Sequence, residues 1–435
     1  MRQLFEKNPH ERLKNLHWEK GDEPSGRSCY FLGSSAHPPE FFGIASSVME
    51  LKGRLKFETS AGVLCDCQFF DDTSPEQLLN NLRKALGTIV ADADNANVRE
   101  IHIYWDLLPE ALNTTPIDVL LSTLGETLEL SCYSARVEPE EKNLVVNLKL
   151  PTTLTKVVPS KVIENALEDG IRRGQALNYA RFLGDLPGNV LTPQVLANYA
   201  EERLANAGQV TIISEKELSA QGFGGILAVA QGSKNRPRLV TFDSDPRKAK
   251  QTVVVIGKGI TFDTGGYSIK GKQHHNEMKY DMCGAANTIA ALEILAPLFP
   301  QTRLIGILPL AENMVSESAQ RPGDVYRAHN GKLIEVYNTD AEGRLILADA
   351  LSYAASFKPD LIIDIATLTG GTTSIANNLA GVMCTNDDSL IPLVRAAGRE
   401  AGEKFVHLEI IEEAIDDLKS DVADVLLVDE VKDVR

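Results

Sequence analysis

The second half of the chain alternates short apolar runs with segments whose apolar residues recur at helical spacing. The runs at 251–256 and 333–337 are apolar and β-branched, as buried strands are. The segments at 283–295 and 345–357 have the spacing of helices that cover a sheet. Further strands are expected at 210–213, 238–242, 303–309 and 360–365. This order predicts an α/β domain with a mixed, mostly parallel central sheet flanked by helices.

The first part of the chain shows a shorter version of the same alternation. Two strands and two helices are expected there, at 98–105, 143–150, 75–86 and 117–124. They predict a small N-terminal α/β domain over residues 1–158. Ser160 suits the N-cap of a helix, which we expect to act as a linker over 159–185. The larger domain would then occupy residues 186–435.

Charged residues gather at two places, each just after a predicted strand. One group follows the strand at 251–256, and the other lies in a turn between the strand at 333–337 and the next helix. Together they contain four carboxylates and three cations: Asp263, Asp281, Asp340 and Glu342 with Lys258, Lys270 and Arg344. Parallel strands of an open α/β sheet place their carboxyl ends at one edge, where ligands bind. We therefore expect the two groups to meet in one pocket.

Four carboxylates in one pocket repel one another unless cations neutralise them. Hard oxygen ligands suit Mg or Mn, and Zn is compatible with them. Two such ions about 3.5–4 Å apart form a clamp suited to hydrolysis. Taken singly, Asp340 and Asp281 are more typical of helix caps, and Glu342 of a first helical turn. Their joint occurrence at these spacings favours a metal site.

These residues resemble the signatures of the cytosolic leucine aminopeptidase family. The matching blocks lie at 257–266, 266–270, 278–286, 338–344 and 366–370. The block at 338–344 matches without a substitution, Thr264 stands where Ser is usual, and 266–270 is similar to the bacterial peptidase B branch. The likeness extends from about Asn178 to about Asp424. The family's last segment, a helix and a strand, is expected to be missing from this sequence.

The resemblance implies two divalent ions, Zn or Mn, in each subunit. The implied metal ligands are Lys258, Asp263, Asp281, Asp340 and Glu342, of which Asp263 and Glu342 bridge the ions. Lys270 and Arg344 would be the catalytic residues, with a bicarbonate at Arg344 as general base. The implied substrate-binding residues are Lys270, Met278, Asn338, Thr367, Leu368 and Gly370. Lys258 can be a ligand only if its pKa falls well below about 10.4, which two adjacent dications would bring about.

The implied reaction is removal of the N-terminal residue of a peptide. A hydroxide shared by the two ions would attack the scissile carbonyl, and Lys270 would stabilise the negative charge that develops there. The free α-amine of the substrate would bind a metal, which restricts the enzyme to peptides with a free N-terminus. Met278 and Thr367 indicate a pocket for uncharged side chains. The resemblance also implies a homohexamer.

Composition narrows the functional classes. The chain has 435 residues, of which 43% are hydrophobic and 24% charged, as in ordinary globular proteins. A formal net charge of −16 disfavours nucleic acids and anionic membranes as partners. The first twenty residues include many charged ones. We find no apolar run near the length of about 18 residues that a membrane span requires. Six scattered cysteines fit reduced thiols, so we expect a cytoplasmic protein.

Two rival functions stay open at this stage. A different two-metal hydrolase, such as a phosphatase, would need cations around an open cavity, whereas Met278 and Thr367 indicate apolar surroundings. A non-catalytic relative, acting as a scaffold or DNA-binding regulator, would be expected to have lost ligands. All the ligand and catalytic positions named above are present.

Overall fold

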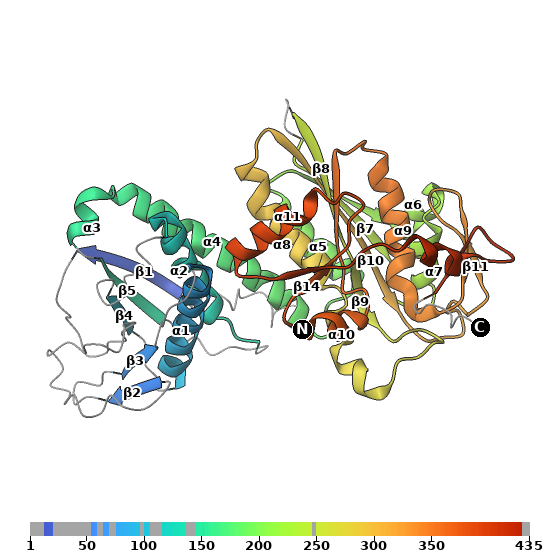
Figure 1. Ribbon diagram of the computed structural model, residues 1–435. Coiled ribbons are helices and arrows are strands. Elements are labelled where there is room, and N and C mark those ends of the chain that lie inside the picture. The colour runs from blue at the N-terminus through green and yellow to red at the C-terminus, as the bar shows by residue number, and fades with distance from the viewer. Residues whose placement is uncertain are drawn as a thin grey trace. The chain divides into compact units, whose positions relative to one another are not determined.

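The structure is a computed structural model that describes most of the chain in nine segments. They are residues 13–20, 54–58, 64–68, 75–95, 100–104, 115–135, 144–150, 152–245 and 249–428. The chain divides into two compact units (Figure 1). One unit is Met1–Asn178 with Pro392–Lys404, and the other is Tyr179–Ile391 with Phe405–Arg435. The helix predicted from Ser160 is observed as α4 (Ser160–Asp185), while the domain ranges given above stay a prediction.

The first unit contains a three-stranded parallel sheet in the order β1-β5-β4. These strands are Leu13–Lys20, Leu144–Leu150 and Glu100–Tyr104. The strands β2 (Arg54–Glu58) and β3 (Leu64–Gln68) form a separate antiparallel pair. The helices are α1 (Pro75–Asn95), α2 (Ile117–Ser131) and α3 (Thr152–Val157). Buried side chains such as Leu86, Leu121 and Val146 form one core between sheet and helices, so the two strands and two helices predicted here are confirmed.

The second unit is built on a mixed sheet in the order β13-β8-β10-β7-β6, with β9 also paired to β10. The strands are β6 (Gln209–Ser214), β7 (Arg238–Asp243), β8 (Gln251–Gly257), β9 (Gly259–Asp263), β10 (Thr302–Asn313) and β13 (Leu361–Ile365). The pairs formed by β8 with β10, β8 with β13 and β9 with β10 are parallel. Strand β7 runs antiparallel to both of its neighbours. The predicted mixed sheet is thus confirmed.

Helices cover this sheet in two pairs, drawn on opposite sides of it in Figure 1. The first pair is α5 (Pro193–Leu204) with α8 (Cys283–Leu298), and the second is α7 (Gly224–Ala230) with α9 (Glu342–Ala355). The remaining helices are α6 (Glu215–Gln221), α10 (Gly371–Ala376), α11 (Leu390–Ala401), and the 3-10 helices η6 (Lys272–Tyr280), η7 (Thr339–Ala341) and η8 (Glu412–Leu418). None of the helices in the described segments has the length and apolarity needed to cross a bilayer.

A three-stranded sheet and a strand pair complete the second unit. Strand β12 (Leu333–Val336) pairs antiparallel with β11 (Val325–Arg327) and parallel with β16 (Val425–Leu427). The strands β14 (Gly381–Met383) and β15 (Phe405–His407) form a parallel pair. Strand β12 leads directly into η7 and α9, and so it places the second group of charged residues.

Local sequence explains where several helices begin and end. Thr192 caps α5 by accepting a hydrogen bond from Val195 N at 3.4 Å, and Pro193 occupies the first turn. A capping box of Ser214 and Glu217 starts α6, which ends at Gly222 with a φ of 81°. Helix α8 extends past the expected range of 283–295, because it includes Pro297 and ends at Leu298.

The core of the second unit fixes α9 against the sheet. Leu345 and Ile346, in the first turns of α9, are fully buried with Ile256 of β8 and Ile305 of β10. Truncating such a side chain to alanine typically costs about 2–5 kcal/mol, so the start of α9 is held firmly in place. The charged residues at that end therefore stand in a fixed position beside the ends of β8 and β9.

Candidate metal centre

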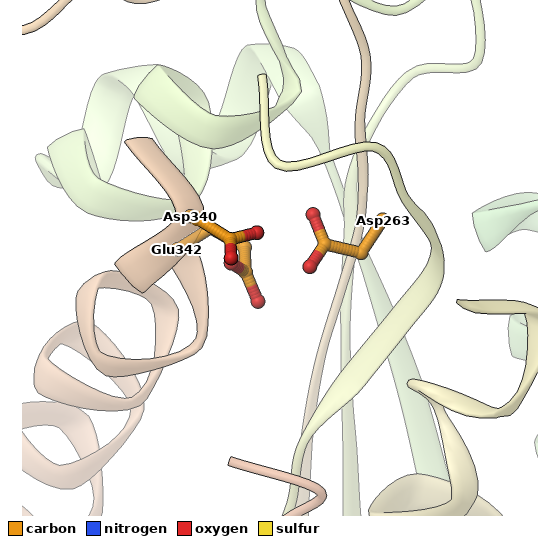
Figure 2. A group of neighbouring side chains, drawn as sticks. All are labelled: Asp263, Asp340 and Glu342. Atoms are coloured by element: carbon orange, nitrogen blue, oxygen red, sulfur yellow. The ribbon is translucent and has the colours of Figure 1, made fainter. Parts of the chain in front are cut away.

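Three carboxylates from separate elements converge at one edge of the second unit's sheet. Asp263 is the last residue of β9, Asp340 lies in η7, and Glu342 is the first residue of α9. Each offers one oxygen, and these oxygens all lie within 4.8 Å of one another. Figure 2 shows the carboxylates of Asp340 and Glu342 facing that of Asp263. Asp263 and Glu342 are buried and Asp340 is half-buried, so the two predicted groups do meet.

Lys258 extends the cluster toward a fourth carboxylate. Its Nζ lies 2.8 Å from Asp281 Oδ1 and 2.9 Å from Glu342 Oε1, and it donates to Thr367 O at 3.0 Å. The Lys258 side chain is only 2% exposed. Its backbone is held as well, because Lys258 N donates to Ile365 O and Lys258 O accepts from Ala285 N. The amine is therefore fixed between two carboxylates of the predicted ligand set.

Lys270 bridges the other two carboxylates. Its Nζ lies 2.8 Å from Asp263 Oδ2 and 2.5 Å from Asp340 Oδ1. The loop that carries it begins with Gly265 and Gly266, whose φ angles of 83° and 61° are strained for other residues. A side chain at 265 would also place its Cβ 2.8 Å from Asp340 Oδ1. Glycine at this position lets the Lys270 loop lie against the carboxylate cluster.

Burial dominates the electrostatics of the carboxylates. It raises the pKa of Asp281 to about 6 even though Lys258 opposes the rise. It also raises the pKa of Glu342 well above its ordinary value, and the neighbouring Asp263 and Asp281 add to this. Burial alone would lower the pKa of Lys258, but the charges of Glu342 and Asp281 raise it above its ordinary value. A buried negative cluster of this kind gains from further positive charge.

The donor set fits divalent cations. Asp281 Oδ2 and Glu342 Oε2 are buried, and neither has a hydrogen-bond partner among the described residues. Buried carboxylate oxygens without a partner are costly, and an ion bound to them removes that cost. Lys258 can join such a set only after losing its proton, and a dication beside it would favour that loss. Oxygen donors with one amine suit Mn or Zn.

Arg344 stands apart from the carboxylates. It lies half-buried in the first turn of α9, and its side chain forms no hydrogen bond or ion pair with another residue in the described part of the chain. The first turn of a 14-residue helix also presents backbone N–H groups that favour an anion. Together, the guanidinium and the helix start suit a small anion.

Comparison with known proteins places the chain in a family. The family model for the catalytic domain of the cytosol aminopeptidase family, peptidase family M17, matches residues 178–433. The chain belongs to the cytosol aminopeptidase family. Members of this family are metallo-aminopeptidases.

Relatives and a solved structure agree with this membership. A protein of Saccharophagus degradans named a probable cytosol aminopeptidase is 34% identical over 355 residues, covering 81% of this chain and 71% of its own length. A protein of the same name from Chlorobaculum tepidum is 46% identical over 269 residues, covering 61% of this chain and 53% of its own length. This chain thus spans only about half the length of the second relative. The bottromycin maturation enzyme BotP, solved in complex with Mn, has a TM-score of 0.80 at 28% identity and covers 93% of this chain and 86% of its own.

Three of the predicted substrate-binding residues, Thr367, Leu368 and Asn338, lie at or beside the carboxylate cluster. Thr367 Oγ1 donates to Asp281 Oδ1 at 2.8 Å, and Leu368 Cδ1 lies 3.0 Å from where a Cβ on Gly343 would be, beside Lys258. Asn338 Oδ1 accepts from Asp340 N at 2.8 Å and so caps η7. Met278 accepts a hydrogen bond from Asp281 N at 3.4 Å through its carbonyl.

Gly370, the last residue of the predicted pocket, is the N-cap of α10. It lies three positions after Thr367 in the sequence. The Gly370 carbonyl accepts a hydrogen bond from Thr373 N at 3.0 Å. The place of Gly370 and Met278 in a substrate pocket therefore stays a prediction.

Asp281 and Asp340, two of the predicted metal ligands, do not act as N-terminal helix caps, which was the alternative considered for them. The N-cap of α8 is Met282, and its side chain makes no cap hydrogen bond, so Asp281 is not the cap of that helix. The N-cap of α9 is Ala341, while η7 is capped by Asn338 rather than Asp340. Both aspartates instead contact the amines of Lys258 and Lys270.

Sequence reasoning missed three residues that shape the centre: Asn313, Thr339 and Gly343. Asn313 is the last residue of β10, a strand expected to end at 309. Its side-chain amide donates to Asp263 Oδ1 at 2.8 Å and to Thr339 O at 3.1 Å. A polar residue at the carboxyl end of a central strand was the signal that could have identified it.

Proposed function

We propose that this chain is an aminopeptidase that hydrolyses the N-terminal peptide bond of peptides at a centre of two divalent ions. The observation that carries the proposal is the convergence of Asp263, Asp340 and Glu342, whose oxygens lie within 4.8 Å of one another. Asp281 and Lys258 adjoin this group through contacts of 2.8 and 2.9 Å. Membership of the cytosol aminopeptidase family supports the same activity.

The proposed ligand set divides between two ions. Lys258, Asp263, Asp281 and Glu342 would hold one ion, and Asp263, Asp340 and Glu342 the other, so that Asp263 and Glu342 bridge. Two bound ions would supply a hydroxide at neutral pH and polarise the scissile carbonyl. The partnerless oxygens of Asp281 and Glu342 support this assignment. Mn is a candidate ion, since BotP is described in complex with Mn, and Zn suits the same donors.

The proposed role of Lys270 is to hold positive charge where negative charge develops. The Lys270 side chain is 17% exposed, whereas that of Lys258 is 2% exposed, so Lys270 is the more accessible amine of the two. The charges of Asp263 and Asp340 outweigh the effect of burial and raise the pKa of Lys270. It therefore stays protonated at neutral pH and can stabilise the oxyanion of the transition state.

Arg344 is proposed to bind a bicarbonate that acts as general base. Its guanidinium has no other partner among the described residues, and it stands in the first turn of α9 beside Glu342 and Gly343. A bidentate pair between a guanidinium and a planar oxyanion would orient that anion toward the centre. When bound there, the anion would supply a general base close to the carboxylate cluster.

The substrate is proposed to be a peptide with a free N-terminus and an uncharged first side chain. Met278, Asn338, Thr367, Leu368 and Gly370 would line its pocket together with Lys270. Leu368 lies beside Lys258, which places an apolar side chain at the edge of the metal centre. We further propose a cytoplasmic homohexamer. The location is compatible with relatives named cytosol aminopeptidase. The oligomer is compatible with exposed apolar side chains on β13 and near η8, such as Ile363 and Ile411.

An aminoacyl p-nitroanilide assay tests the proposal. The purified protein with added Mn or Zn should release p-nitroaniline from a leucine substrate with a free amine and leave the N-acetylated substrate intact. Asp340→Ala and Lys270→Ala should abolish release, while Asp388→Ala, at an exposed position, should not. Hydrolysis of p-nitrophenyl phosphate without peptidase activity would favour the rival phosphatase.

A further inference from the structure

We propose that Asn313 and Thr339 form an interlock that sets the spacing between two halves of the metal centre. The β9 half consists of Asp263 and the loop to Lys270, and the α9 half consists of Asp340 and Glu342. The inference rests on the proposed function, because the two halves supply the ligands of the same pair of ions. Both interlock residues are buried, Asn313 at 1% exposure and Thr339 at 0%.

Asn313 ties the halves together through its side-chain amide. The amide nitrogen donates to Asp263 Oδ1 at 2.8 Å in the β9 half, and to Thr339 O at 3.1 Å next to Asp340. Both partners are acceptors, so the nitrogen and not the oxygen of the amide faces them. The Asn313 backbone adds a second attachment, because its carbonyl accepts from Thr264 N and Thr264 Oγ1, each at 3.0 Å.

Thr339 ties the halves together from the other side. Its Oγ1 donates to Gly265 O at 2.6 Å and accepts from Ser268 N at 2.8 Å. Its backbone N donates to Ser268 Oγ at 3.2 Å. These three bonds fasten the loop between Asp263 and Lys270 to the residue just before Asp340. The position of Lys270 relative to the α9 half therefore depends on Thr339.

The close approach of the two halves requires glycine at position 266. A Cβ there would fall 2.9 Å from Thr339 Oγ1 and 3.2 Å from Asn313 Oδ1, and the φ of Gly266 is 61°. The loop therefore packs directly on both interlock residues.

The chemistry of the interlock suits a site for cations. Asp263 Oδ1 accepts from Asn313 Nδ2 and from Gly265 N at 2.9 Å, which fixes the carboxylate plane. Both donors are neutral, so they orient the carboxylate without repelling a dication. A cationic donor such as Arg or Lys in their place would repel it. Hydrogen bonds to metal ligands of this kind typically change metal affinity about 10- to 100-fold.

The decisive experiment measures Mn binding to metal-free full-length variants by calorimetry and electron paramagnetic resonance. Asn313→Ala should bind Mn about 10- to 100-fold more weakly than the wild type. It should also lose the spin-coupled signal of paired ions, because the bridging position of Asp263 is no longer fixed. The matched control is Ser233→Ala. Ser233 is also buried and donates to Glu312, the neighbour of Asn313 on β10, so its loss should cost stability and leave Mn affinity unchanged.

A second pair of variants, at Thr339, tests the interlock even if Asn313→Ala does not fold. Thr339→Val keeps the shape of the side chain and removes the hydroxyl, whereas Thr339→Ser keeps the hydroxyl. The valine variant should weaken Mn binding about 10-fold or more, and the serine variant should restore it. Wild-type affinity and coupling in both Asn313→Ala and Thr339→Val would overturn the interlock alone. A wild type that binds no Mn would overturn the interlock and the proposed function together.

Discussion

Gly343 lies directly against Lys258. A Cβ built on residue 343 would come within 2.7 Å of Lys258 Cε and 2.8 Å of its Nζ, and 3.0 Å from Leu368 Cδ1. Because the Lys258 amine also contacts Asp281 and Glu342, it has no room to yield without leaving its carboxylate partners. The glycine of the 338–344 signature is thus the residue that makes space for the buried amine.

This contact predicts that Gly343→Ala displaces the Lys258 amine. We expect Mn affinity and peptidase turnover to fall about 10- to 100-fold, as when a metal ligand loses its support. The matched control is Gly87→Ala in α1, where a Cβ would meet only Ser131 Oγ at 3.5 Å. That variant should keep wild-type Mn affinity, measured by calorimetry. Equal Mn affinity in Gly343→Ala and wild type would contradict the prediction.

Lys258→Met should destabilise the metal-free protein strongly. The variant leaves Asp281 and Glu342 buried without their ammonium partner, and breaking a buried pair in this way costs about 3–5 kcal/mol. Urea denaturation in the presence of a chelator measures the loss. Lys279→Met is the control, because Lys279 is partly exposed and pairs with Asp185 at 3.9 Å, a contact worth about 1 kcal/mol or less. Similar losses for the two variants would show that Lys258 is not paired as described.

Arg344→Gln should separate catalysis from metal binding. The side chain contacts none of the carboxylates, so Mn stoichiometry and unfolding midpoint should match the wild type. Loss of a bound general base should lower kcat by about 10²- to 10⁴-fold. Bicarbonate added to carbonate-depleted protein should raise the turnover of the wild type and leave the variant unchanged. If the variant were also stimulated, the anion would bind elsewhere.

Asp243 provides a pH test away from the metal centre. Burial would raise its pKa, but hydrogen bonds from Arg303 and from the backbone outweigh burial and lower it. A carboxylate with a lowered pKa in the folded state adds stability above its ordinary pKa, and this is lost as the pH falls through the folded value. Asp243→Asn should therefore cost about 1 kcal/mol at pH 6–7 and progressively less below about pH 4. Urea denaturation across pH measures this, and a cost that grows toward low pH would contradict the assignment.

The sequence predicted most elements of the second unit, because their apolar patterns are strong. The strands at 210–213, 238–242 and 251–256 and the helix after 345 all appear. Strands β7 and β8 and helix α9 bury several apolar residues each, whereas β6 buries only Ile213. Strand β9 was not predicted, because Gly257 and Gly259 look like the end of a strand. The chain continues past Lys258 in the same direction and pairs again with β10, further along that strand. Only the tertiary pairing with β10 reveals it.

The sequence was enough to name the candidate ligand residues, which stay a proposal, but not the residues that support them. Carboxylates in two charged groups after strands are a local signal, and the resemblance to a family gave them roles. Asn313 and Thr339 are ordinary polar residues in the sequence, and their importance arises from hydrogen bonds between segments far apart in the chain. The segment between Lys270 and Asp281, for which no helix or strand was predicted, contains the 3-10 helix η6.

A crystal structure of the Mn-soaked protein, with anomalous scattering recorded at the Mn edge, tests the central claim most directly. The account predicts two anomalous peaks in each chain, both bound by Asp263 and Glu342, with Lys258 Nζ on one ion and Asp340 on the other. Absence of such peaks, with Lys258 still paired to Asp281 and Lys270 still paired to Asp263, would contradict it.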